Sequence, residues 1–204
     1  MSGHGHGAHG HGDDSSNKHS RTIAIVISIL ALCLAIAETM AKGAQTSSIS
    51  QNVEASNLWS FYQGKTIRQT MIKTAAEQME IDVALSKDPA VKSRLEKRVA
   101  DWKTTVERYE SEPVVAANGE NKGEGKKELA ERAKDAGKKR DYALAQYHQF
   151  ELSSASFQIA IVLASAYLIT SALYLLWATG LVGAIGVFFG LIGLFAPNAI
   201  HLIH

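Results

Sequence analysis

Cysteine, proline and C-terminal charge are scarce in this sequence. Cysteine occurs once, as Cys33, so an intrachain disulfide is excluded. Proline occurs three times in 204 residues, which leaves long stretches without a helix breaker. No Asp, Glu, Lys or Arg follows Glu151, and a run of roughly 50 uncharged, mostly apolar residues would expose more apolar surface in water than soluble monomers tolerate. Lipid accepts such a run when helices bond all its backbone groups, so the sequence predicts an integral membrane protein.

Charge is confined to the middle of the chain. All but two of the 21 Lys and Arg residues and all but three of the 20 Asp and Glu residues lie between Lys42 and Glu151. Acids and bases are interleaved there, and the formal net charge is +1. Binding to nucleic acid requires a clustered excess of basic side chains, so we expect no nucleic-acid partner. The middle is predicted to lie in water and the two ends in the bilayer.

The N-terminal residues 1–21 are rich in Gly, His and Ser, and they have no large apolar side chain after Met1. We therefore expect a disordered tail. Its glycine-spaced histidines are His4, His6, His9 and His11. Neutral imidazoles on a flexible chain can gather around zinc, nickel or copper. A fixed site also needs defined spacing and supporting hydrogen bonds, so a solvated, weakly chelating tail is the alternative interpretation.

Residues 22–40 form the first apolar run, and its length suits a helix that crosses about 30 Å of hydrocarbon. Glu38 lies near its end, where we expect the carboxylate to reach the headgroups. The segment Ala35-Ile36-Ala37 resembles a signal-peptidase site, with Lys18 and Arg21 in front of the apolar run. A cleaved signal peptide therefore competes with a retained membrane span.

Residues 41–156 are predicted to form an extramembrane helical domain of coiled-coil or bundle type, with helices at about 43–88, 90–112 and 126–156. The first helix carries two apolar stripes, which indicate contact with more than one partner helix. One stripe contains Ile49, Val53, Ile67, Met71, Ile81 and Leu85, and the other contains Leu58, Tyr62, Ile72, Met79 and Val83.

The second helix is predicted from Asp88-Pro89, which supplies an N-cap and a first-turn proline. Its apolar residues recur at spacings of three and four, which is typical of a coiled-coil seam. They are Val91, Leu95, Val99, Trp102, Val106 and Tyr109. Pro113 and the glycines that follow predict a flexible loop at 113–125. The third helix is expected to continue into the membrane without interruption.

Residues 157–179 and 181–202 are predicted to be the second and third membrane spans, with a tight turn at Gly180 between them. The last span is short before Pro197. Tyr174 and Trp177 are aromatic side chains of the kind that favour the interface. Four glycines fall on one face of the last span, and we interpret this face as a helix-packing surface rather than a permeation path. They are Gly183, Gly186, Gly190 and Gly193.

Catalysis has no support in the sequence. Phosphate loops, zinc-protease helices, nucleophile elbows and paired cysteines are all missing, so we expect neither an enzyme nor a bound cofactor. The aromatic residues Trp59, Phe61, Tyr62 and Trp102 are interpreted as core residues.

A family resemblance rests on the segment that follows the first apolar run. This segment contains Ala44-Gln45-Thr46, then Val53 to Trp59 (VEASNLW), then Tyr62-Gln63, then Lys65 to Thr70 (KTIRQT). With these residues the chain resembles the bacterial membrane proteins grouped as domain of unknown function 4337. The resemblance implies one span, a helical middle, a closing hairpin of spans and a bacterial inner membrane. It implies no activity and no catalytic residues.

The predicted fold class is therefore all-α, an integral membrane protein with three transmembrane helices and an extramembrane helical domain. Lys18 and Arg21 favour a cytoplasmic N-terminus, whereas Lys42 and, farther off, Lys138, Lys139 and Arg140 nearly balance them on the other flank. The first span has the charge layout of an uncleaved signal anchor, so we expect a periplasmic middle. We expect a membrane-anchored helical scaffold or interaction protein, which forms a homo-oligomer or binds partner helices. The alternative is an accessory subunit for metal or ion transport that uses the tail histidines.

Overall fold

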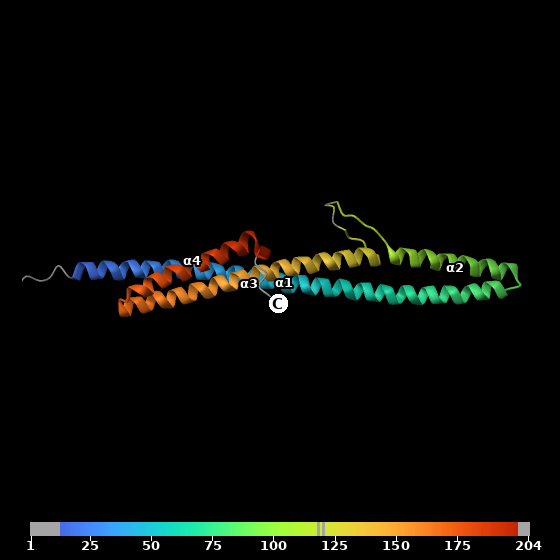
Figure 1. The fold of residues 1–204 in the computed structure, drawn as a ribbon. Helices are drawn as coiled ribbons and strands as arrows, with labels where there is room; N and C mark the ends of the chain where they lie inside the picture. Colours follow the sequence, from blue (N-terminus) through green and yellow to red (C-terminus); the bar gives the residue numbers. More distant parts are fainter. Residues whose placement is uncertain (1–12, 118, 120, 200–204) are drawn as a thin grey trace, which may run out of the picture. The chain divides into compact units, whose positions relative to one another are not determined.

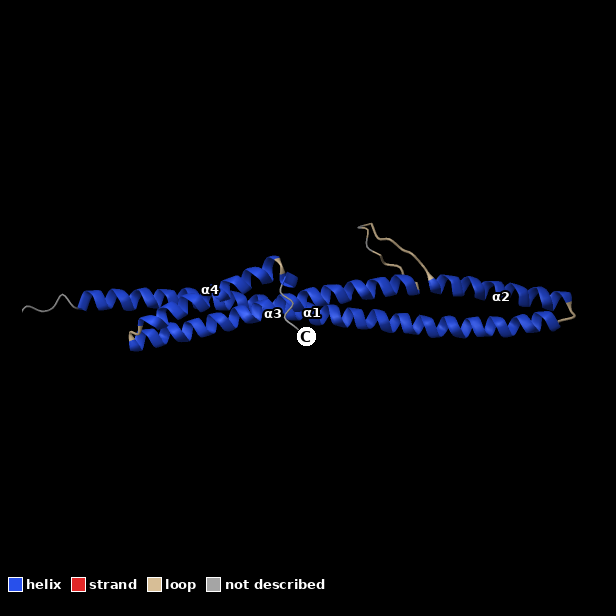
Figure 2. Ribbon diagram, in the orientation of Figure 1, coloured by secondary structure: helices blue, strands red, loops and turns tan. Residues whose placement is uncertain are grey.

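The computed structural model describes residues 13–117, 119 and 121–199, and in this part of the chain the fold is all-α (Figures 1 and 2). Residues 1–12, with the predicted metal ligands His4, His6, His9 and His11, lie outside the described residues. In the described part of the chain, four α-helices and a short 3-10 turn follow one another. They are α1 (Asp13–Leu85), α2 (Pro89–Glu110), α3 (Lys126–Thr170), α4 (Leu173–Phe195) and η1 (Pro197–Ala199).

The first helix, α1, has 73 residues and includes the whole of the first apolar run. The prediction of a disordered tail through residue 21 is wrong for residues 13–21, which belong to this helix. The physical reason is that neither glycine nor proline occurs between Asp13 and Lys42, so nothing separates the start of the apolar helix from the polar residues before it.

The chain divides into two compact units, and α1 and α3 each contribute to both. The terminal unit consists of Met1–Thr46 and Tyr142–His204, and the middle unit consists of Ser47–Asp141. The middle unit lies inside the predicted extramembrane domain 41–156, whose position relative to a membrane stays a prediction.

In the middle unit, α2 and the start of α3 both pack along α1. The turn after Leu85 brings α2 back along α1 (Figure 1). The predicted cap is confirmed, because the Asp88 side chain accepts a hydrogen bond of 2.8 Å from the Ala90 N–H and proline occupies the first turn. Closer to the start of the unit, α1 and α3 share a small apolar core. It contains Ala55, Leu58, Leu129, Ala133 and Ala136, with Tyr62 packed against it.

The terminal unit consists of α1 up to Thr46, α3 from Tyr142 and the whole of α4. Ala41 and Ala44 of α1 pack with Phe150 of α3, and Tyr147 covers this cluster. The absence of a break in α3 was predicted and is confirmed, since one helix runs from Lys126 to Thr170.

The turn between the last two helices lies at Ser171 and Ala172, so its predicted place at Gly180 is wrong. Ser171 has a φ of 55°, and its N–H donates to the carbonyl of Tyr167 at 2.8 Å, which closes the end of α3. Gly180 is an ordinary helical residue of α4. The reason for the difference is that one left-handed residue suffices to end a helix, and serine can occupy that conformation at a modest cost. With the turn at Ser171, α4 has 23 residues and is not the short helix that the sequence predicted.

Candidate functional site

Among the residues that the structure describes, three helices are long and apolar enough to cross a membrane, namely α1, α3 and α4. Within the most apolar window of each, the protein itself buries only 11%, 28% and 17% of the residues, respectively. The side chains left open include Leu32 of α1, Val162 of α3 and Phe188 of α4, each more than half exposed. Such surfaces need lipid or another apolar partner.

The glycine face of α4 packs against α3 and α1. A Cβ placed on Gly186 would lie 2.9 Å from the ring of Phe157, and one on Gly193 would lie 2.9 Å from the ring of Phe150. The same construction at Gly190 meets the hydroxyl of Ser153 at 3.2 Å, and at Gly183 it meets Leu30 of α1 at 3.4 Å. The missing side chains therefore let aromatic rings of α3 lie directly on the backbone of α4.

Polar side chains of α3 reach the α4 backbone across this smooth face. The Ser153 hydroxyl donates to the carbonyl of Gly186 at 2.7 Å, and the Gln146 amide donates to the carbonyl of Gly193 at 3.2 Å. The second bond has a specific cause, because the N–H that would bond the Gly193 carbonyl in a continuing helix belongs to residue 197, which is proline. Gln146 thus supplies the donor that Pro197 lacks.

Gln149 extends this set of bonds by one more turn. It is 1% exposed, and its amide lies 3.5 Å from the carbonyl of Pro197. Together Ser153, Gln146 and Gln149 fix the register of α4 on α3. A translation of α4 along α3 would break all three hydrogen bonds at once. Glu38, the carboxylate at the end of the first apolar run, accepts a bond of 3.3 Å from the Gln158 amide of α3.

In the middle unit, a polar junction joins all three helices. The Gln69 amide of α1 donates to the Val106 carbonyl at 3.0 Å and to the Glu110 carboxylate at 3.2 Å, both on α2. The Lys126 ammonium of α3 donates to the Gln69 carbonyl oxygen at 2.8 Å and to Glu110 at 3.1 Å. Hydrogen bonds from Gln69 and then from Lys126 lower the pKa of Glu110 below its ordinary value.

A second carboxylate, Glu128, fixes the loop between α2 and α3. It accepts hydrogen bonds from the Ser111 hydroxyl at 2.6 Å and from the Glu112 N–H at 3.2 Å. Burial raises the pKa of Glu128, but the bonds from Ser111 and from backbone N–H groups outweigh burial, so the pKa lies below its ordinary value. Gly125 is required here, because a Cβ on it would collide with the Glu128 carboxylate and the Glu112 nitrogen.

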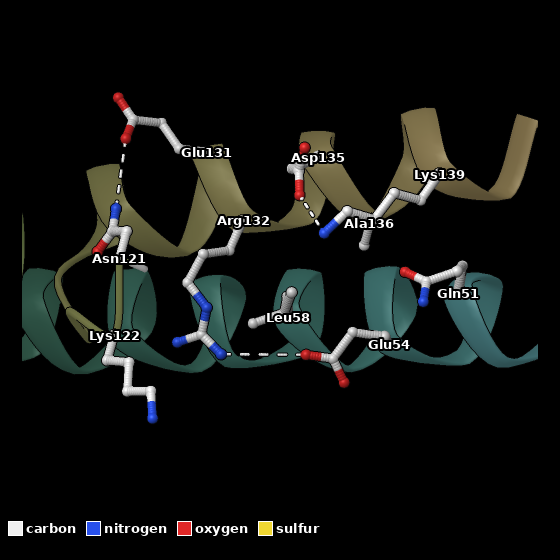
Figure 3. A pocket seen from close by; sticks show the side chains of 10 residues that line it. All are labelled: Gln51, Glu54, Leu58, Asn121, Lys122, Glu131, Arg132, Asp135, Ala136 and Lys139. Atoms are coloured by element: carbon white, nitrogen blue, oxygen red, sulfur yellow. Dashed lines mark hydrogen bonds and ion pairs between the residues drawn. The ribbon is translucent and has the colours of Figure 1, made fainter. Parts of the chain in front are cut away.

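A charged pocket of about 420 Å³ lies between α1 and the start of α3 (Figure 3). Its charged walls are largely paired with one another. The Arg132 guanidinium lies 3.9 Å from the Glu54 carboxylate, and the Lys139 ammonium lies 2.8 Å from the Asp135 carboxylate. Among the described residues there is no group of three or more His, Cys, Asp or Glu side chains that could hold a metal ion. The pocket therefore has walls of mixed charge, and the described residues that line it include no such group of metal ligands.

The sequence profile of a known family matches residues 19–196, which include all of α2, α3 and α4 and nearly all of α1. Its description is "Domain of unknown function (DUF4337)". The chain belongs to this family. No protein with a curated description and no solved structure matches it.

The DUF4337 match confirms the resemblance that the residues around Trp59 predicted. It begins at residue 19, so the four tail histidines lie outside the matched part of the chain. Because the family has no assigned activity, the residues of this member are interpreted from their own contacts.

The predicted coiled-coil seam of this DUF4337 protein lies on the face of α2 that turns towards α1. Val99 is buried, and Leu95, Trp102, Val106 and Tyr109 are half-buried, whereas Val91 at the start of the helix is exposed. Lys103 pairs with Glu80 of α1 at 2.6 Å, and the Tyr109 ring lies 5.4 Å from the ammonium of Lys65. The seam of α2 therefore packs against α1 of the same chain.

The two predicted stripes of α1 have different environments. Leu58 is buried, and Tyr62, Ile72, Met79 and Val83 are half-buried on the side of α2 and α3. All six residues of the other stripe are more than half exposed. The interpretation of the aromatic residues as core is wrong for Phe61, which is 68% exposed, and for Trp59, which is 39% exposed, because neither belongs to the packed stripe.

Sequence reasoning missed the side chains that join the helices, above all Gln69, Lys126, Gln146 and Ser153. Their bonds link residues 16 to 57 positions apart, so no local periodicity marks them. One signal was available at Gln146. Because Pro197 has no N–H, the carbonyl of Gly193 lacks its usual donor within the helix. A side-chain amide nearby is therefore expected to donate to it.

Proposed function

We propose that this DUF4337 protein is a membrane-anchored helical scaffold that brings copies of itself together. One observation carries the proposal: α1, α3 and α4 expose long apolar surfaces, and α1 exposes a second, separate apolar stripe in the middle unit. The first kind of surface suits lipid, and the second suits a helical partner.

The family resemblance and the charge pattern support a proposed location. We infer a bacterial inner membrane with the N-terminus in the cytoplasm and the middle unit in the periplasm, since Lys18 and Arg21 precede the first apolar run. A retained first span fits the packing of Leu30 against Gly183, because cleavage after Ala37 would remove Leu30 from that contact.

The accessory role in ion transport has less support. It required the glycine face of α4 to line a path, yet Phe150, Ser153 and Phe157 fill the space above those glycines. The scaffold uses the exposed apolar surfaces of α1, α3 and α4, whereas the transport role depends on tail histidines that the structure does not describe.

The test uses the full chain in native membranes. We expect it to resist extraction by alkaline carbonate and, after mild detergent solubilisation, to have a mass above that of one copy over a range of protein concentrations. Static light scattering with detergent correction measures that mass. A strictly monomeric chain at all concentrations, in membranes and in detergent, would contradict the scaffold.

A further inference from the structure

A narrow apolar slot lies within the terminal unit, where residues of α1, α3 and α4 surround a volume of about 170 Å³. Its α1 wall extends from Cys33 to Met40, its α4 wall from Gly186 to Leu194, and α3 forms the third side from Phe150 to Phe157. None of the described residues that line the slot is charged. All of them belong to the three helices that are apolar enough to cross a membrane.

The slot exists because α1 touches its neighbours on either side of it but not in between. Above Cys33, Leu30 lies against Gly183 of α4, where a Cβ on the glycine would be 3.4 Å away. Beyond Met40, Ala41 and Ala44 pack with Phe150 of α3. Between these contacts the α4 wall stays open, and its side chains Val187, Leu191 and Leu194 are 44% to 50% exposed. The slot is therefore a gap with an outward mouth in an otherwise packed group of helices.

The walls of the slot favour an apolar occupant over water. Ser153 is the one hydroxyl among the described lining residues, and it already donates to the Gly186 carbonyl at 2.7 Å. Glu38 belongs to the same stretch of α1 but does not line the slot, and its carboxylate accepts from Gln158 instead. A buried water needs two to four polar partners, which these walls do not supply.

The dimensions of the slot exclude a helix as the occupant. At about 1.5 Å per residue, each of its long walls extends for about 11 Å along the helix. A volume of 170 Å³ over that length leaves a mean cross-section of about 15 Å². A helix with its side chains is about 10 Å across, so it cannot enter. A single extended hydrocarbon chain is thin enough.

The two ends of the slot lie at different levels of the proposed membrane spans. At one end, Lys42 follows Met40 by two residues and Glu151 follows Phe150 directly, so this end lies where charge begins. At the other end, Cys33 lies well inside the apolar run of α1. The slot thus runs parallel to the spans, from the level of the headgroups into the hydrocarbon. This is the path of an acyl chain in a bilayer.

We propose that one acyl chain of a membrane phospholipid occupies the slot and completes the packing of α1 against α4. The inference rests on the membrane anchoring in the proposed function and is independent of self-association. It assigns the terminal unit a lipid-binding site, whose ligand is recognised by the shape of its hydrocarbon chain and not by its headgroup.

Retention of lipid by the full-length chain tests the slot. Chains purified in mild detergent and depleted of lipid are incubated with dioleoyl phosphatidylcholine and analysed by native mass spectrometry. Cys33→Phe fills the slot from the α1 wall. Its matched control is Ala31→Phe, which adds a ring at an exposed position about 160° away on the same helix. We expect wild type and Ala31→Phe to retain a phospholipid and Cys33→Phe to retain about tenfold less, the factor that excluding two buried methylene groups is worth.

A second pair of variants guards against a folding defect that is peculiar to Cys33→Phe. Val187→Trp fills the slot from the α4 wall, and Ile185→Trp places the same ring on the other side of that helix. Circular dichroism checks that all four variants stay helical. We expect Val187→Trp to lose lipid as Cys33→Phe does, and Ile185→Trp to retain it.

The other outcomes separate failure of the slot from failure of the membrane anchor. No retention by wild type, or equal retention by slot variants and controls, would overturn the slot, while resistance to alkaline carbonate would keep the anchor. Equal retention of dihexanoyl phosphatidylcholine, which has the same headgroup but short chains, would show recognition of the headgroup and would also overturn it. Loss of oligomeric mass in Cys33→Phe with unchanged lipid retention would assign the slot to a side chain of a second copy. Extraction of the wild type by carbonate would contradict anchor and slot together.

Discussion

At the scale of single residues, close approach between α3 and α4 depends on side chains that are missing. Gly186 is the tightest example, because the Phe157 ring occupies the space that a Cβ would need. We expect Gly186→Val to lower the free energy of unfolding of the terminal unit in detergent by about 1–3 kcal/mol, the usual cost of overpacking. Thermal unfolding followed by circular dichroism measures this change.

The matched control for Gly186→Val is Gly180→Val. Gly180 belongs to the same helix, and a Cβ on it would meet nothing within 4 Å. This variant should unfold at nearly the wild-type temperature. Equal losses at the two positions would show that the glycines act through helix propensity alone and not through contact with α3.

A second residue-scale prediction concerns the carbonyl of Gly193. The Gln146 amide donates a hydrogen bond to it, because Pro197 has no N–H to do so. Gln146→Ala should lower the free energy of unfolding by about 1 kcal/mol, the typical value for such a bond. In a Pro197→Ala background the backbone N–H is restored, so the same change should cost clearly less. A double-mutant cycle measures the difference, and an equal cost in both backgrounds would contradict the assigned role of Gln146.

At the scale of elements, the hydrogen bonds of Glu128 to the loop between α2 and α3 predict a pH dependence of the middle unit. The Glu128 pKa in the folded chain lies below its ordinary value of 4.5. A lowered folded-state pKa means that the ionised carboxylate stabilises the fold above pH 4.5 and that this stability is lost as the pH falls through the folded-state pKa. Glu128→Gln should be less stable at neutral pH and should lose less stability on acidification. Denaturant unfolding from neutral to acidic pH measures both effects.

Glu124→Gln is the control for this pH dependence, because Glu124 is exposed in the loop before α3 and its replacement makes the same change of charge. It should keep the acid sensitivity of the wild type. An identical pH profile for Glu128→Gln and wild type would mean that the bonds of Glu128 to the loop between α2 and α3 do not contribute acid-labile stability.

The helices themselves could largely be predicted from the sequence, whereas their ends and contacts could be predicted only where the signal is local. Asp88 and Pro89 act within one turn, and the start of α2 was predicted correctly. The end of α3 could not be predicted, because Ser171 takes a left-handed conformation that no local residue requires. Gly180 carried the stronger breaker signal but stays helical in α4, since a glycine permits a turn without imposing one.

Contacts between helices could likewise be predicted from the sequence only in part. The glycine face of α4 could be seen from its spacing, but its neighbours Phe150 and Phe157 could not, because the register of α3 on α4 depends on where the turn lies. Moving the turn from Gly180 to Ser171 changes every facing pair. The two stripes of α1 were both visible in the sequence, yet only the structure shows which of them the chain itself uses.

At the scale of the whole molecule, the central proposal is that α1, α3 and α4 each cross a bilayer and leave the middle unit on one side of it. Three crossings require the loop before α3 and the turn at Ser171 to lie on opposite sides, whatever the sidedness of the N-terminus. Single cysteines at Ala117 and Ser171 in a Cys33→Ser background report this, because both positions are exposed. In sealed vesicles of known orientation, a membrane-impermeant maleimide should label Ala117→Cys from one side only and Ser171→Cys from the other side only. Labelling of both positions from the same side would contradict the three-span account.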